Sequence, residues 1–239
     1  MIEIKKGIEP EGLKELREDS MLSDLSPKEM FAELKNPLKA RVIESLRHEQ
    51  GQLCVYCMSR IPREDKDPGI AGTTIEHFIP IDSLDRCNAE LALEYNNLFA
   101  VCHGNVKKRI KGVRRNRTKD DLTCDKHRGN TEFRKIDPRK KETLQTIFYT
   151  LDGRIDASDP DVRFDLVNTL NLNCASAPLI TERKAALDAL INEIGKVEEK
   201  YIHSYCIEIL NEFMDEKDSK TPYAGILIWY LQTMIAALA

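Results

Sequence analysis

The spacing of apolar and polar positions predicts two helices within the first fifty residues. Ser26, Pro27 and Glu29 form the pattern of a capping box with proline at the first helical position, so one helix should begin there. Asn36-Pro37 interrupts that helix, because a proline disfavours helical geometry in the residue before it. A second helix should follow and end near residue 51, because apolar residues recur at helical spacing at Leu38, Val42, Ile43 and Leu46.

Beyond about residue 136 the pattern predicts a hairpin followed by helices. Residues 145–150, the turn Asp152-Gly153 and a returning segment at Ile155 indicate two antiparallel strands. Asp159-Pro160 should start a helix, and a longer helix is predicted from about 178 to 213. The last helix, residues 223–238, is apolar on almost every side. Because a membrane span needs about 20 residues, we expect this helix to be buried against the chain itself or against a partner.

These elements indicate an α+β fold in three regions. Residues 1–51 form an N-terminal arm with helices, residues 52–135 hold the residues that suggest chemistry, and residues 136–239 form the hairpin and the C-terminal helices. The N-terminal sequence lacks the apolar segment of a secretory signal, so the expected compartment is the cytoplasm.

The charged residues are unevenly distributed along the chain. The chain of 239 residues is 41% hydrophobic, enough for a globular core, and its net charge of −4 argues against a surface that is basic throughout. One short stretch is strongly basic and contains no acidic residue. It is interpreted as a surface for the phosphate backbone of a nucleic acid rather than as a merely solvated run. Its cationic residues are Lys107, Lys108, Arg109, Lys111, Arg114, Arg115, Arg117 and Lys119.

Four of the seven cysteines are predicted to hold a structural zinc ion. An odd number does not suit a closed set of disulfides, and cytoplasmic thiols stay reduced. The expected ligands are one Cys-x-x-Cys knuckle and two later cysteines, namely Cys54, Cys57, Cys102 and Cys124. His103, next to Cys102, is the alternative fourth ligand. The remaining thiols are expected to be buried or incidental, and they are Cys87, Cys174 and Cys206.

The same region contains residues suited to hydrolysis of a phosphodiester, which needs an activated water and stabilised charge on the phosphoryl oxygens. His77 is the candidate general base, because an imidazole titrates near neutral pH. Glu76 is assigned to a catalytic metal ion, and Asn97 to a hydrogen bond that orients the loop carrying His77. His127 is the candidate second ligand of that ion, with Asp125 as its rival.

The order of these residues resembles the HNH, or ββα-metal, endonuclease family. IEHFIP at 75–80 is similar to the acid-His-x-x-Pro strand of that family, NNL to its middle Asn-Leu, and CDKHRGN to the helix that supplies its last metal ligand. The resemblance implies a β-hairpin packed on a helix, one catalytic magnesium or manganese ion, and cleavage that leaves a 5′ phosphate. With the zinc site, the expected fold is a zinc-stapled ββα-metal core with flanking α-helices.

A second resemblance spans nearly the whole chain. The segments MIEIKKGIEPEGLKELRE, RHEQGQLCVYC, TCDKHRGN and FYTLDGRI are similar to the PtuB nuclease subunits of Septu-type and retron-associated antiphage systems. This resemblance implies a PtuA-like ATPase as partner. The leading expectation is therefore a DNA endonuclease in an ATPase-nuclease defence complex. The alternatives are an RNA endonuclease, acting for example on tRNA through the same site, and a non-catalytic zinc ribbon that binds nucleic acid or a partner.

Overall fold

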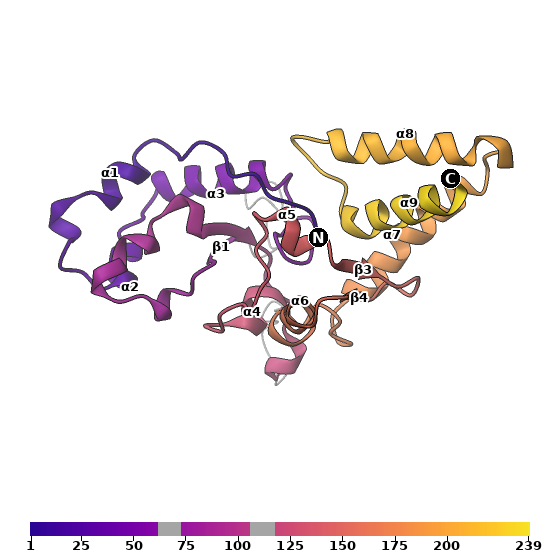
Figure 1. Cartoon of the computed structure of the whole chain (residues 1–239). Coiled ribbons are helices and arrows are strands. Elements are labelled where there is room, and N and C mark those ends of the chain that lie inside the picture. The colour runs from indigo at the N-terminus through magenta and orange to yellow at the C-terminus, as the bar shows by residue number, and fades with distance from the viewer. Residues whose placement is uncertain (62–72, 106–117) are drawn as a thin grey trace, which may run out of the picture.

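The fold combines α-helices with short antiparallel sheets, as the sequence predicts. The computed structural model describes residues 1–61, 73–105 and 118–239. Figure 1 shows α1 to α3 and β1 on one side of the molecule and α7 to α9 on the other. The segments that contain α4, α5 and α6 lie between these two parts. The middle of the molecule therefore receives elements from both halves of the chain.

The N-terminal region contains α1 (Leu13–Arg17), a 3-10 turn (Ser20–Leu22), α2 (Pro27–Ala32) and α3 (Leu38–Glu49). The capping box at the start of α2 is confirmed. The Glu29 amide donates to Ser26 Oγ at 3.4 Å, and the Glu29 carboxylate accepts the Ser26 amide at 2.9 Å. Val42 and Leu46 of α3 are fully buried, as the predicted apolar stripe requires.

The first sheet pairs β1 (Thr74–His77) with β2 (Leu98–Val101) in antiparallel register. Glu76 lies opposite Phe99, and His77 lies opposite Leu98. Every residue of β2 is buried, so this strand is covered on both faces. The connection contains the 3-10 helices η2 (Ile81–Ser83), η3 (Arg86–Ala92) and η4 (Tyr95–Asn97).

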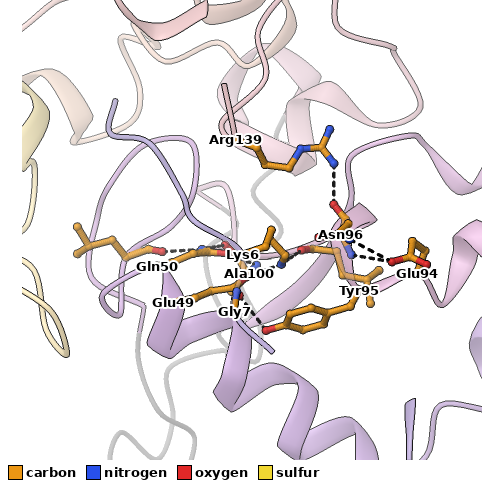
Figure 2. Close-up of polar contacts among 11 residues, drawn as sticks. Lys6, Gly7, Glu49, Gln50, Glu94, Tyr95, Asn96, Ala100 and Arg139 are labelled. Carbon is orange, nitrogen blue, oxygen red and sulfur yellow. Dashed lines mark hydrogen bonds and ion pairs between the residues drawn. The ribbon is translucent and has the colours of Figure 1, made fainter. Parts of the chain in front are cut away.

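Side chains of the N-terminal region hold β2 in place (Figure 2). Gln50, just after α3, donates from Nε2 to the Ala100 carbonyl at 2.7 Å and accepts the Ala100 amide at 2.8 Å. Its amide thus satisfies both backbone groups of Ala100, as a neighbouring strand would. Lys6 forms an ion pair with Glu49 and donates to the Leu98 carbonyl at 2.9 Å. These contacts fix β2 against α3.

The middle of the molecule contains η5 (Lys119–Asp121), α4 (Cys124–Arg128), α5 (Lys141–Leu144), α6 (Pro160–Phe164) and a π-helical turn, η6 (Asp165–Thr169). The predicted hairpin is confirmed as β3 (Ile147–Tyr149) paired with β4 (Ile155–Ala157). Its turn requires Gly153, because φ is +90° and a Cβ there would lie 2.3 Å from the Ile180 carbonyl oxygen.

The prediction of one helix from about 178 to 213 is wrong. The chain instead forms α7 (Leu179–Ile194), a turn through Gly195 with η7 (Glu199–Tyr201), and α8 (Ile202–Asp215). Both α7 and α8 pack on the last helix, α9 (Ala224–Leu238), which the turn between them makes possible. Helical spacing continues across the turn, so the pattern alone did not reveal the break.

The first half of α9 is buried against this chain. Ile226, Leu227 and Leu231 are buried, and the Trp229 ring lies against Tyr149 of β3 with centroids 6.1 Å apart. From residue 232 onward the helix is largely exposed. Within the described ranges, no helix is both long and apolar enough to cross a membrane.

Candidate metal centre and neighbouring catalytic residues

The four cysteines predicted as zinc ligands converge on one point. Their Sγ atoms all lie within 4.8 Å of one another. The Sγ–Sγ distances are 4.0 Å for Cys54 and Cys124, 3.7 Å for Cys57 and Cys102, and 3.8 Å for Cys102 and Cys124. Zn–S bonds of about 2.3 Å place the corners of a tetrahedron about 3.8 Å apart, so this set fits one zinc ion. A disulfide would need sulfur atoms about 2 Å apart.

The first knuckle is a tight turn that follows α3. The Met58 amide donates to the Cys54 carbonyl at 3.0 Å, and the Cys54 amide donates to the Ser59 carbonyl at 2.9 Å. Met58 adopts a positive φ of 61°, which lets the chain reverse within the knuckle. The Ser59 hydroxyl lies 3.1 Å from Cys57 Sγ, where it can donate to a thiolate.

Gly104 allows the second half of the centre to form. Cys102 follows β2, whereas Cys124 is the first residue of α4. Between them, the Thr123 amide donates to the Gly104 carbonyl at 3.0 Å. A Cβ on Gly104 would lie 2.2 Å from the Thr123 oxygen, and its φ is +53°, so only glycine fits. Gly104 is not among the residues predicted from the sequence, although its place two positions after the candidate ligand Cys102 was a usable signal.

The electrostatics of the cluster favour a cation. Burial raises the pKa of Cys54 well above its usual value, and the neighbouring Cys102 thiol raises the pKa of Cys124. In contrast, a hydrogen bond from Cys102 lowers the pKa of Cys57. Four clustered thiols, three of them buried, therefore do not ionise together without a positive charge among them. A divalent ion supplies that charge, and thiolate sulfur is a preferred ligand of zinc.

Arg128 of α4 binds the carboxylate of Glu76 in the protein interior. Its Nη1 forms an ion pair with Glu76 and donates to the His77 carbonyl at 3.1 Å, and Nη2 donates to the Phe78 carbonyl at 2.5 Å. The Arg128 side chain is fully buried. Arg128 is not among the residues predicted from the sequence, although its spacing from Asp125 places both on one face of a helix.

Glu76 and Asp125 lie near enough for each carboxyl group to affect the pKa of the other. Burial raises the pKa of Glu76 well above its usual range, and the nearby Asp125 acts in the same direction. Burial alone would raise the pKa of Asp125, but its contacts with Glu76, Lys126 and Arg128 outweigh burial and lower it. A positive charge beside the pair favours the ionised form of both carboxyl groups, and Arg128 supplies one.

His77 is buried and oriented by one hydrogen bond. Its Nε2 lies 2.9 Å from the Ala92 carbonyl oxygen, and its ring meets the Phe31 ring edge to face with centroids 4.5 Å apart. A carbonyl only accepts, so Nε2 carries the proton and the lone pair of the neutral ring is on Nδ1. Burial lowers the pKa of His77, which keeps the ring neutral at neutral pH.

Asn97 holds the loop that follows His77. Its Oδ1 accepts the Ile79 amide at 2.7 Å, and its Nδ2 donates to the Leu91 carbonyl at 2.9 Å and the Ile79 carbonyl at 3.3 Å. This is the hydrogen bonding across the loop that the sequence analysis expected. Arg139 donates to the carbonyl of the preceding Asn96 at 2.8 Å (Figure 2).

His127 is oriented as a metal-binding histidine would be, but it does not join the two carboxylates. Its Nδ1 lies 2.9 Å from the Thr169 carbonyl oxygen, which leaves Nε2 available as a ligand atom. In the part of the chain that the structure describes, the cysteine cluster is the only group of three or more possible ligands. Glu76, Asp125, His127 and His103 therefore belong to no such group, although the two carboxyl groups affect each other's pKa.

Of the residues predicted to bind nucleic acid, the structure describes only Lys119. Lys119 is exposed at the start of η5. The other predicted contacts lie outside the described residues, namely Lys107, Lys108, Arg109, Lys111, Arg114, Arg115 and Arg117. Of the three cysteines left out of the zinc set, Cys174 and Cys206 are buried and Cys87 is exposed.

Fold and site together define an α+β protein with four clustered cysteines that could hold a metal ion, beside a short antiparallel strand pair. No protein-family model and no curated protein matches this chain.

Proposed function

We propose that this chain is a metal-dependent endonuclease of the HNH type that hydrolyses phosphodiester bonds of DNA. The observation that carries the proposal is the pair of adjacent residues on β1. Glu76 lies beside Asp125 of α4, and His77 is a neutral imidazole whose tautomer is fixed by the Ala92 carbonyl. A carboxylate pair next to an oriented base is the donor set that metal-assisted hydrolysis requires.

His77 has the role of general base in this proposal. Because Nε2 donates to Ala92, Nδ1 takes the proton of the attacking water. The lowered pKa keeps Nδ1 unprotonated at neutral pH, so the base is ready before substrate binds. Asn97 is a positioning residue, since it holds the backbone of Ile79 two residues beyond the base.

Glu76 and Asp125 fit a hard divalent cation. Magnesium is usually bound through one or two carboxylates and keeps its other positions for water and phosphate. An ion held there would stabilise negative charge on the phosphoryl oxygens. Arg128 binds Oε1 of Glu76 and so orients the carboxylate. This geometry favours Asp125 over His127 as the second ligand.

The proposal includes a place in a larger assembly. The similarity to PtuB subunits supports a PtuA-like ATPase as partner and a role in antiphage defence. The exposed second half of α9 offers one surface for such a partner, since Met234 and Ile235 are only partly covered by this chain. Both assignments are tested by copurification of the two chains and by phage challenge of cells that express them.

The direct test is cleavage of supercoiled plasmid and of total tRNA by purified protein, with and without its ATPase. Magnesium and manganese are added in turn, and His77→Ala is compared with His203→Ala, a control on α8 remote from β1. We expect plasmid cleavage that needs the divalent ion, persists in His203→Ala and is lost in His77→Ala while zinc content is unchanged. If the protein cleaves tRNA but not plasmid, the substrate is RNA rather than DNA. Equal cutting by both variants would reject the proposed base.

The Glu76–Arg128 ion pair favours a second candidate, a zinc-stapled binding module without catalysis. A buried carboxylate held by a buried guanidinium is also a structural tie between β1 and α4. The two candidates differ for Asp125→Asn, because Asp125 is not the partner of that ion pair. Loss of cutting with unchanged stability supports catalysis. Nucleic-acid binding by wild-type protein that never cuts, under any of the conditions above, supports the binding module.

A further inference from the structure

One buried cation of the C-terminal helices has only neutral hydrogen-bond partners. Arg183 of α7 is 2% exposed, although arginine is rarely buried without an anion beside it. Its Nε donates to the Gly153 carbonyl at 2.7 Å, and its Nη2 donates to the Leu172 carbonyl at 2.7 Å and to Asn173 Oδ1 at 3.2 Å. In the part of the chain that the structure describes, Arg183 forms no ion pair, whereas the buried Arg128 is paired with a carboxylate. Its hydrogen bonds are thus satisfied, but its charge is not balanced.

The groups around Arg183 leave the clustered cysteines as the source of negative charge. Burial lowers the pKa of Arg183, but a guanidinium remains protonated in proteins. The groups that oppose this effect of burial are two tyrosines and two of the clustered cysteines, namely Tyr149, Tyr223, Cys57 and Cys124. Burial raises the pKa of both tyrosines, so their hydroxyl groups are uncharged at neutral pH. The nearby Met1 amine is uncharged as well, because burial lowers its pKa to about 5.

A short buried loop connects Arg183 to one of these cysteines. The Leu170 carbonyl accepts the Cys124 amide at 2.8 Å, and two residues further on the Leu172 carbonyl accepts Arg183 Nη2. Two residues span at most about 7 Å, so the guanidinium lies on the order of 10 Å from the Cys124 backbone. Leu170 and Leu172 are both fully buried. The two charged groups are therefore separated by protein interior, where water screens charge only weakly.

The cysteine cluster carries negative charge once it binds a metal ion. Four thiolates contribute −4 and a zinc ion contributes +2, so the loaded cluster has a net charge of −2. A buried anion and a buried cation each lose hydration, and their mutual attraction offsets part of that cost. The empty cluster, with its thiols protonated, offers Arg183 no such attraction.

We propose that Arg183 is the counter-charge of the metal-loaded cysteine cluster, so that helix α7 strengthens metal binding without supplying a ligand. The hydrogen bonds to Gly153, Leu172 and Asn173 hold the guanidinium in place for this role. The inference is independent of the proposed nuclease activity, because it concerns only the charge of the cluster. Its test therefore measures metal binding and needs no nucleic acid.

The experiment measures zinc affinity at neutral pH by competition with a chelator. Arg183→Gln removes the charge but keeps a hydrogen-bond donor, and Arg183→Lys keeps the charge. Two unit charges about 10 Å apart at an effective dielectric constant of about 20 change a binding constant by about tenfold, and the double charge of the cluster increases the effect. We therefore expect Arg183→Gln to weaken zinc binding by about tenfold or more and Arg183→Lys to restore most of the affinity.

Lys184→Gln is the matched control. It removes the same charge one residue further along α7, from a side chain that is 48% exposed, so zinc affinity should change little. Circular dichroism at saturating zinc separates loss of fold from loss of affinity. If Arg183→Gln does not fold, a folded Arg183→Lys protein with nearly wild-type affinity still supports the need for the charge.

Four results would overturn the proposal. Equal weakening in Arg183→Gln and Arg183→Lys, or loss of fold in both, would show that only the hydrogen bonds of Arg183 matter. Wild-type affinity in Arg183→Gln would show that the charge has no effect on the metal. An equal effect in Lys184→Gln would assign the change to the general charge of the chain, and wild-type protein that binds no zinc would leave Arg183 without the anion.

Discussion

Replacing Cys124 by serine should remove the metal and unfold the middle of the molecule. Cys124 is fully buried, and its amide donates to the Leu170 carbonyl at 2.8 Å, so the centre ties α4 to the π-helical turn. Apparent binding energies of structural zinc are about 10 to 16 kcal/mol, whereas whole domains are stable by only about 5 to 15 kcal/mol. If loss of one thiolate releases the metal ion, the lost binding energy should exceed the free energy of unfolding of this region.

The assay combines metal analysis, X-ray absorption and urea unfolding. For wild-type protein we expect one zinc ion per chain with four sulfur neighbours at about 2.3 Å, the distance that the Sγ spacing implies. Cys124→Ser should lose the ion and the cooperative transition. Cys87→Ser, an exposed thiol in η3, should keep both. A folded Cys124→Ser protein with one bound zinc and an unchanged urea midpoint would refute the four-cysteine site.

Three further predictions concern residues around this centre. Because burial lowers the pKa of His77, the unfolded chain binds its proton first on acidification, so stability should fall as the pH drops below about 6.5. Urea unfolding at two pH values, with zinc content checked, should show that acidification lowers the free energy of unfolding less in His77→Asn than in the wild-type protein. An equal decrease in both proteins would mean that another group causes the pH dependence. Gly104→Ala should lower the free energy of unfolding by about 1 to 3 kcal/mol or more, because the residue has a positive φ and its new Cβ would clash with the Thr123 carbonyl oxygen. Gly7→Ala should lower it less, because the atom nearest to its new Cβ would be 3.5 Å away. Truncation after Leu231 should keep zinc and weaken binding of the proposed ATPase partner, and unchanged affinity in a titration would place that proposed interface elsewhere.

The position of the truncation follows from a contact that the sequence did not indicate. The Tyr223 amide donates to the Met58 carbonyl at 2.9 Å, and a Cβ on Gly225 would lie 2.6 Å from Met58 Cε. The first turn of α9 therefore rests on the knuckle formed by Cys54 and Cys57. A cut after Thr221 would remove this support, so it would not separate partner binding from the stability of the metal centre.

The sequence by itself determined most local elements and the candidate metal ligands. The capping box at Ser26 and the hairpin around Gly153 follow from short-range spacing and turn chemistry, whereas the strand that carries Glu76 and His77 was expected from the resemblance of IEHFIP to a family motif. The cysteines were identifiable because few residue types bind zinc, and Cys54 and Cys57 have the spacing of a knuckle.

Only the tertiary structure decided which groups meet. Arg128 reaches Glu76 across 52 positions of sequence, and Asp165 reaches the Arg134 amide across 31. Such contacts depend on how helices and strands dock, which periodicity does not encode. The break after Ile194 was hidden for the same reason, since helical spacing continues through the turn and only packing on α9 requires it. Sequence thus fixes what each short segment can form and which metal its side chains prefer, whereas the charge pairs and the position of Arg183 arise from long-range packing.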